Sequence, residues 1–181
     1  VVTDFLDFAR HRPLEMERFK ARDLLGDIAH LMAGEIDDAT CSLVVETDPE
    51  DIEVTADHQH LRRAVINAVR NAYQASETGA TITLAVYAPS DGQRVITITD
   101  DGPGIPEETL AQILEPFFTT KEKGSGLGLA LISQIVDQHG GEMTIESKVG
   151  DGTQVRLRLP FNDDVDVSEP QPVEVPEGWL G

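Results

Sequence analysis

The stretch from Arg94 to Ile105 joins a strand pattern to a carboxylate and a glycine-rich turn. Residues 95–99 are all β-branched, and this pattern favours a strand. Asp100 follows directly, and Gly102 and Gly104 come next. The strand would fix the carboxylate, while the glycines would let backbone approach a flat ligand that a Cβ would exclude. Taken alone, the stretch could also be a strand that ends in a Gly-Pro-Gly turn.

Two asparagines, Asn67 and Asn71, lie four residues apart in a segment whose pattern predicts a helix from about Asp57 to Ala75. This spacing places both amides on one helix face. Asparagine is a poor helix former, so a pair within an apolar helix indicates a specific role. An amide oxygen can bind a hard cation, and Mg²⁺ at ATP sites is held by few protein ligands together with phosphate oxygens. Two solvent-exposed asparagines are the alternative.

Three alternate glycines, Gly124, Gly126 and Gly128, precede a predicted helix over residues 127–138. They would expose backbone N–H groups at a helix start, where the helix dipole favours phosphate. Ser125 adds a hydroxyl donor and Lys121 a mobile positive charge. The spacing matches neither a P-loop nor the Gly-x-Gly-x-x-Gly pattern of dinucleotide-binding folds, so neither is expected.

The aromatic pair Phe117-Phe118 precedes these glycines and could anchor the ends of a flexible lid. An ordinary core role for both rings is compatible with that. Without nucleotide, the segment from Thr119 to Gly126 has few compensating contacts, so we expect it to be mobile when empty.

Helix and strand patterns alternate along the chain, and neighbouring strands are mostly joined by hairpin signals. This arrangement predicts one mixed sheet with helices on one face, a two-layer α/β sandwich. The expected helices are residues 1–12, a segment capped by Asp23 that carries Leu24, Leu25, Ile28, Leu31, Met32 and Ile36, and residues 57–75, 106–114 and 127–138. The expected strands are residues 42–47, 52–55, 81–88, 94–99, 143–147 and 154–159. Residues 15–20 could form a short strand or an extended linker.

The 181 residues suffice for one domain with appendages, and their net charge of −19 argues against nucleic-acid binding. Cys41 is the single cysteine, which fits a reducing compartment and predicts a cytoplasmic location. No apolar run is long enough to cross a membrane, although a parent protein could still be membrane-anchored. The start at Val1 suggests a fragment. The acidic, proline-containing residues 161–181 predict a disordered tail.

Five motifs together resemble the catalytic ATP-binding domain of sensor histidine kinases, within the superfamily shared with gyrase and mismatch-repair ATPases. The resemblance covers residues 14–160, and residues 1–13 resemble the end of the second helix of the kinase dimerisation hairpin. It implies an α/β (α+β) sandwich in which a mixed sheet of about five strands packs on about three helices, preceded by an N-terminal helix. The motifs are Asn67/Asn71, Asp100-x-Gly102-x-Gly104, Phe117-Phe118, Gly124-x-Gly126-x-Gly128 and Gly150-x-Gly152-Thr153.

The resemblance implies a role for each motif. Asp100 would bind the adenine amino group, Asn71 would ligate Mg²⁺ with Asn67 beside it, and Lys121 would hold phosphate. Asn67 and Lys121 are the candidate catalytic residues. The full candidate ATP site is Asn67, Asn71, Asp100, Gly102, Gly104, Ile105, Phe118, Thr119, Thr120, Lys121, Gly124, Ser125, Gly126, Leu127, Gly128, Leu129 and Thr153. The chain departs from the family at Arg63, where many relatives have glutamine, and at Gln74, which replaces a lysine.

The phosphoacceptor signature of the family is absent, and none of the five histidines has the neighbourhood for that role. The expected partners are therefore a dimerisation and phosphoacceptor domain outside this chain, a response regulator receiver domain, and a second parent subunit. A gyrase-type ATPase clamp, an anti-sigma-type serine kinase and an ATP-sensing scaffold are the alternatives. Asn67 disfavours the clamp, because the hydrolases of the superfamily have a glutamate there and an amide cannot take a proton from water.

Overall fold

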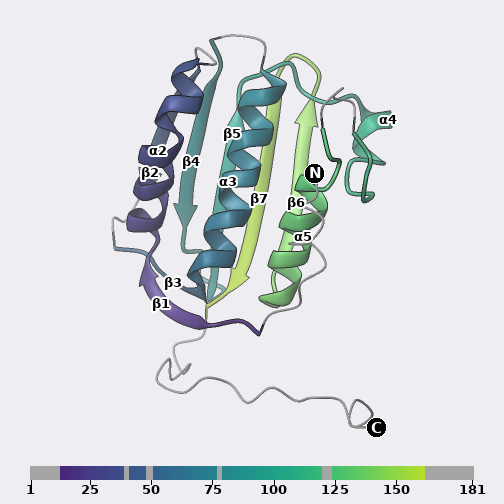
Figure 1. Cartoon of the computed structure of the whole chain (residues 1–181). Coiled ribbons are helices and arrows are strands. Elements are labelled where there is room, and N and C mark those ends of the chain that lie inside the picture. Colours follow the sequence, from purple (N-terminus) through teal and green to yellow (C-terminus); the bar gives the residue numbers. More distant parts are fainter. Residues whose placement is uncertain (1–12, 39–40, 48–50, 77–78, 120–123, 162–181) are drawn as a thin grey trace, which may run out of the picture.

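The computed structural model describes residues 13–38, 41–47, 51–76, 79–119 and 124–161 (Figure 1). The predicted helix over residues 1–12 lies outside these ranges, as does the predicted tail after Phe161. The division of the chain into residues 1–13, 14–160 and 161–181 therefore stays a prediction.

Five strands form the main sheet in the order β2-β4-β5-β7-β6. β2 and β4 are parallel, while the other neighbouring pairs are antiparallel, so the sheet is mixed as expected. The strands are β2 (Ser42–Thr47), β4 (Thr81–Tyr87), β5 (Gln93–Asp100), β6 (Glu142–Lys148) and β7 (Gly152–Pro160). Both predicted hairpins, β4–β5 and β6–β7, are present.

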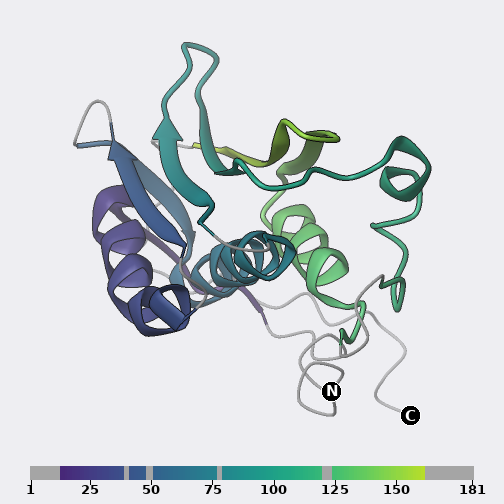
Figure 2. The same ribbon diagram turned by 90° about the horizontal axis from the view of Figure 1, so that it is seen from above.

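Three long helices cover one face of this sheet, as the view from above shows most clearly (Figure 2). They are α2 (Ala21–Asp38), α3 (His58–Ala75) and α5 (Gly128–Gln138). Their buried apolar side chains, with those of the strands, form one core that includes Leu24, Leu61 and Ile132. The predicted two-layer sandwich is therefore confirmed, and α3 lies at its centre.

A second sheet, absent from the prediction, pairs β1 (Met16–Lys20) with β3 (Glu53–Asp57) in antiparallel register. β1 leads straight into α2, because the Ala21 N–H donates to the Ile52 carbonyl at 2.9 Å. The predicted helix start at Asp23 is therefore wrong, and Asp23 lies in the first turn instead. The prediction that Leu31 joins the apolar face of α2 is also wrong, since this side chain is 52% exposed.

The short helix α4 (Glu107–Leu110) ends earlier than the predicted Leu114. No residue of α4 is buried, and Leu114 is exposed, so only Ile113 attaches this segment to the protein interior. A single buried side chain gives a helix no apolar face to pack, which explains why turns replace its second half.

Asp57 joins β3 to the first turn of α3 and to the end of α5. Its carboxylate accepts hydrogen bonds from the N–H groups of His60 (3.0 Å) and Glu15 (2.9 Å). Its own N–H donates to Nε2 of His139 at 2.9 Å, while Nδ1 of His139 faces the Ile135 carbonyl at 2.7 Å. His139 is therefore a neutral imidazole with both nitrogens used. This contact fixes α5 beside α3.

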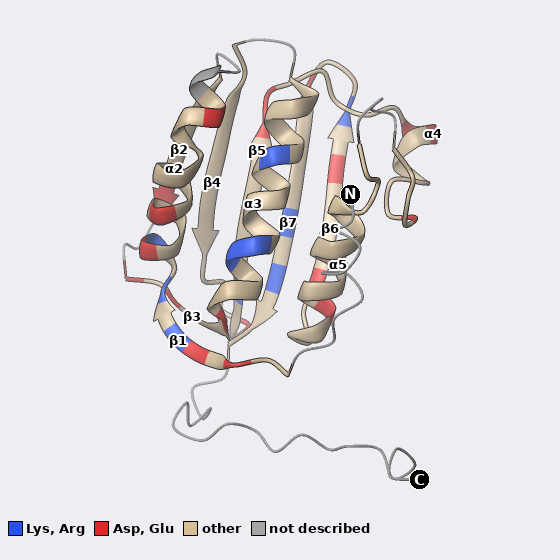
Figure 3. Cartoon of the chain, in the orientation of Figure 1, with Lys and Arg blue, Asp and Glu red and all other residues tan. Residues whose placement is uncertain are grey.

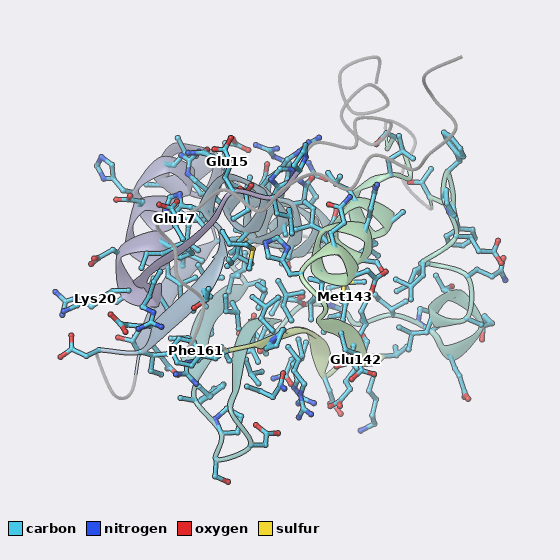
Figure 4. All side chains as sticks on the ribbon, turned by 90° about the horizontal axis from the view of Figure 1, so that it is seen from below. Glu15, Glu17, Lys20, Glu142, Met143 and Phe161 are labelled. Atoms are coloured by element: carbon cyan, nitrogen blue, oxygen red, sulfur yellow. The ribbon has the colours of Figure 1, made fainter. Side chains whose placement is uncertain are left out.

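Charge is distributed unevenly over this framework. Figure 3 shows basic residues on α3 and β7 and acidic ones on α2 and β6. At the end of the sheet where β7 stops, the Phe161 ring lies under the Arg94 guanidinium, 3.6 Å from its centroid. Figure 4 shows Phe161 at this lower edge, with Lys20 projecting away from the end of β1. These features lie at the far end of α3 from Asn71.

Candidate functional site

A cleft of about 1190 Å³ opens beside α3, bounded by residues 103–106, α4, and residues 118–119 and 124–129. This volume suits a ligand of nucleotide size. Many of the predicted ATP-site residues, from four separate segments, line it together. They are Asn67, Asn71, Gly104, Ile105, Phe118, Thr119, Gly124, Ser125, Gly126, Leu127, Gly128 and Leu129.

The two asparagines on α3 face this cleft, as their spacing predicts, but they differ in their contacts. Asn67 Nδ2 donates to the Arg63 carbonyl at 2.9 Å, one turn earlier, and this contact orients the amide. No hydrogen bond within the described chain engages the Asn71 amide. A Cβ on Gly128 would lie 3.4 Å from both the oxygen and the nitrogen of that amide. Asn71 therefore presents an available amide oxygen to the start of α5.

The donor set fits Mg²⁺ bound together with phosphate and does not fit a cation caged by protein alone. Among the described residues, no group of three or more His, Cys, Asp and Glu side chains could hold a metal ion. Mg²⁺ takes one or two protein ligands and completes its octahedron with water and phosphate oxygens. The Asn71 amide oxygen can supply one such ligand.

Asp100 lies at the end of β5 and is only 6% exposed. Its Oδ1 accepts from the Gly102 N–H at 3.0 Å, and Thr153 lies opposite Asp100 in the antiparallel β5–β7 pair. Burial raises the pKa of Asp100 above its usual value, while the nearby backbone N–H groups of Gly102 and Thr153 act in the opposite direction. Asp100, Gly102 and Thr153 are not among the residues that line the cleft; they adjoin its wall through Pro103 and Gly104.

Gly102 is required for close packing against this carboxylate. A Cβ there would lie 2.8 Å from both Asp100 Oδ1 and Ser76 Oγ. The glycine thus permits the close backbone approach that the sequence pattern indicates.

The segment before α5 is closed by a backbone contact between Phe117 and Gly126. The Phe117 N–H donates to the Gly126 carbonyl at 2.9 Å, and both residues have positive φ, +71° and +67°. A Cβ on Gly126 would lie 2.4 Å from the Phe117 carbonyl carbon. The ordinary core role that the sequence allowed for Phe117 is not found, because this side chain is 62% exposed, while Phe118 lines the cleft.

Part of the predicted phosphate site cannot be placed. Thr120 and Lys121 lie outside the described residues, as do all of residues 120–123 in the segment predicted to be mobile. The roles of Lys121 in catalysis and in phosphate binding therefore stay predictions.

Residues not assigned to the site from sequence also line the cleft, most of them on α3. Arg62, Arg63 and Arg70 add positive charge to this wall. Arg70 also donates to both carboxylate oxygens of Glu35 on α2, at 2.9 and 3.2 Å, and Tyr73 Oη donates to the same carboxylate at 2.6 Å. The Glu35 hydrogen bond raises the pKa of Arg70. Arg63 and Arg70 lie four and three residues from Asn67, and this spacing is the signal that could have revealed them. The remaining members of this set are Gln59, Ile66, Gln74, Ala75, Pro103, Pro106, Thr109, Ile113 and Leu131.

Comparison with known families identifies this arrangement. Residues 56–163 match the model of the histidine kinase-, DNA gyrase B- and HSP90-like ATPases. The chain belongs to this ATPase family. The match covers α3, the Asp100 turn, the glycine segment and β6–β7, which are the parts of the chain that build the cleft and its wall.

Named relatives of this ATPase domain are histidine kinases. Sporulation kinase C of Bacillus subtilis (strain 168) is 29% identical over 167 residues, which is 91% of this chain and 38% of the kinase. Full-length ShkA in complex with AMPPNP has a TM-score of 0.79 at 27% identity, over 88% of this chain and 35% of that one. Histidine kinase ThkA in complex with the response regulator TrrA has a TM-score of 0.76 at 29% identity, over 89% and 46%.

These comparisons confirm the resemblance to histidine kinase catalytic domains and the fold that it implies. The chain spans less than two fifths of the length of curated relatives such as Sporulation kinase C. No helix within the described residues combines the length and apolar character that a membrane span needs.

Proposed function

We propose that this domain binds Mg-ATP in the cleft and transfers the γ-phosphate to a histidine on a dimerisation hairpin outside residues 14–160, for relay to a response regulator aspartate. The observation that carries the proposal is the meeting of the α3 amides with the glycine segment in one cleft, within an ATPase family domain. The relatives add support, since ShkA is bound to AMPPNP and ThkA to a response regulator.

The adenine end would be formed by Asp100. Its carboxylate would accept a hydrogen bond from the adenine amino group, and a charge-assisted bond of this kind contributes roughly 1.5–3 kcal/mol. Because burial raises the pKa of Asp100, its ionised form is disfavoured in the empty protein, and a donor from the base would stabilise it. Guanine would present a carbonyl oxygen, which repels the carboxylate.

The phosphate end would be formed by Asn71, the backbone N–H groups of residues 124–128 and Lys121. When bound, Mg²⁺ neutralises charge on the phosphate oxygens and orients the γ-phosphate. Asn71 would supply the protein ligand, and the start of α5 would donate N–H groups to phosphate. Arg62 and Arg63, which line the cleft from α3, would add positive charge that attracts the phosphates.

Asn67 would limit hydrolysis. Its Nδ2 donates to the Arg63 carbonyl, so the side chain is held by its own helix. An amide can orient water but cannot take its proton, whereas a neutral imidazole is already nucleophilic near pH 7. Transfer would therefore wait for an acceptor histidine. The gyrase-type clamp is the second candidate, favoured by the family that both share.

The test is transfer in trans. The chain is mixed with a separately produced dimerisation hairpin and γ-labelled ATP, with a hairpin lacking its acceptor histidine as the matched control. Acid-labile, base-stable phosphate on the intact hairpin alone is the expected result. ATP consumption with no label on either hairpin would favour the clamp.

A further inference from the structure

Ser147, near the end of β6, contacts three separate segments with one hydroxyl. Its Oγ lies 2.8 Å from the Ile105 nitrogen, 2.8 Å from the Gly152 carbonyl oxygen and 2.8 Å from Thr153 Oγ1. None of the motifs that define the candidate site includes this serine, and it does not line the cleft.

The three contacts have one consistent assignment. The Gly152 carbonyl can only accept, so the single Ser147 proton is donated there. The Ile105 N–H can only donate, so Ser147 Oγ accepts from it, and Thr153 Oγ1 must then donate into the second lone pair. The hydroxyl therefore uses its one proton and both lone pairs, which leaves it no capacity for water or ligand.

Two of these partners lead to the adenine end of the cleft. Ile105 lines the cleft directly. Thr153 on β7 is the cross-strand partner of Asp100 in the antiparallel β5–β7 pair. One side chain thus joins the cleft wall to the strand end that carries Asp100.

The same wall is attached to the β6–β7 turn by further backbone contacts. The Gly150 N–H donates to the Pro103 carbonyl at 2.9 Å. Gly104 has φ +71°, and a Cβ there would lie 2.1 Å from the Lys148 carbonyl oxygen. Residues 103–105 therefore lie directly on β6, and Ser147 provides the side-chain contact of this attachment.

We infer that Ser147 is a positioning residue for adenine recognition, which holds the Ile105 wall and the Thr153–Asp100 pair in register. The inference rests on the proposed function, because it assigns the adenine end of the same ATP site. The hydroxyl acts only through Ile105 and Thr153, so its removal should weaken binding of the base and leave the phosphate end unchanged.

Binding of adenosine and of Mg-ATP to the 181-residue chain tests this directly. Ser147→Ala should raise the Kd for both ligands by the same factor, about five-fold, as expected for the loss of a hydrogen bond. The Mg²⁺ concentration that gives half-maximal ATP binding should not change. Ser147→Thr, which keeps the hydroxyl, should restore both affinities. Ser42→Ala, an exposed serine on β2, is the matched control and should bind as the unmodified chain does.

Amide exchange gives a second readout that needs no nucleotide. The Ile105 N–H should exchange at least about ten-fold faster in Ser147→Ala, since it loses its acceptor. A purely structural serine would lower the melting temperature without this selective change. If Ser147→Ala does not fold, Thr153→Val removes one of the three contacts and should weaken adenosine binding in the same direction.

The two hypotheses fail in different ways. The positioning role would be overturned, with the ATP site intact, if Ser147→Ala bound adenosine as tightly as the unmodified chain. If Ser147→Ala does not fold, the same result in Thr153→Val would overturn it. An equal loss of adenosine affinity in the control Ser42→Ala would overturn it as well. A chain that binds neither adenosine nor Mg-ATP before any substitution would overturn the proposed function itself.

Discussion

The two ends of the cleft are built differently. At the proposed adenine end, Ser147 Oγ bonds to Thr153 Oγ1, and Thr153 pairs with Asp100 across β5 and β7. At the phosphate end, the Asn71 amide faces Gly128 with no hydrogen-bond partner in the described chain. A flat base must be recognised by fixed groups, whereas phosphate and Mg²⁺ bring strong charge and can order their own ligands. In the proposed function, the strands would therefore provide base specificity, and α3 with the glycine segment would provide the catalytic end.

The largest effect should come from the phosphate end. Asn71→Ala removes the proposed Mg²⁺ ligand and should lower transfer to the hairpin by about a hundred-fold or more, which corresponds to ~2.7 kcal/mol of barrier. The melting temperature should hardly change, because the amide contributes little to the core. Transfer assays at varied Mg²⁺ concentration measure this. The same Mg²⁺ dependence of ATP binding with and without Asn71 would contradict the ligand assignment.

A smaller effect is expected at the adenine end. Asp100→Asn replaces a carboxylate by an amide that both donates and accepts, so Mg-ATP should bind about ten-fold more weakly, at ~1.4 kcal/mol per factor of ten. The ratio of the affinities for ATP and GTP should also be smaller in Asp100→Asn than in the unmodified chain. Competition binding of the two nucleotides gives the answer, and equal affinities for ATP and GTP in the unmodified chain would refute the role of Asp100.

Gly126, before α5, and Gly128, its first residue, should differ in how well they tolerate a side chain. A Cβ on Gly126 would lie 2.4 Å from the Phe117 backbone at φ +67°, whereas one on Gly128 would lie 3.4 Å from the Asn71 amide. Gly126→Ala should therefore weaken Mg-ATP binding by about five-fold and Gly128→Ala by about two-fold, each worth ~1 kcal/mol or less. Adenosine binding should be unaffected in both. The reverse order of the two variants would show that the Phe117–Gly126 contact does not shape the phosphate end.

The smallest effect concerns the framework that both ends share. Burial lowers the pKa of His139 below its ordinary value of 6.5, although the Ile135 carbonyl and Asp57 act in the opposite direction. The unfolded chain then binds the proton more readily, so the free energy of unfolding should fall as pH decreases below about 6.5, by at most ~1.4 kcal/mol per pH unit. Urea unfolding at pH 7.5 and 5.5 measures this loss. His139→Gln should show a flatter dependence over that interval, and an unchanged slope would contradict the assignment.

Much of the fold was predictable because its signals are local. The β-branched residues of β5, the Asp57 cap of α3 and Gly140 after α5 each indicate an element or its end within a few residues. The pairing of β1 with β3 was missed, because it joins segments about 40 residues apart that carry no hairpin signal. The length of α4 was overestimated, because its acidic first turn predicts where a helix starts but not how little of it is buried.

The site was predictable where spacing alone brings residues together. Asn67 and Asn71 share a helix face, and the glycines mark a helix start. Ser147 was missed, because a serine within a strand carries no local sign that its hydroxyl meets residues 42 positions earlier. The exposure of Phe117 was missed as well, because an aromatic pair normally indicates core, and only the positive φ at Phe117 explains why its ring leaves the interior.

We propose that this domain holds Mg-ATP but needs an external histidine to use it. Steady-state phosphate release by the 181-residue chain, with and without the dimerisation hairpin, tests it most directly. We expect release far below ~1 per second from the chain alone, a modest increase in Asn67→Glu, and labelled phosphate on the hairpin once it is added. Release at about 1 per second or faster without the hairpin, a rate typical of dedicated enzymes, would contradict the kinase assignment and favour the ATPase clamp.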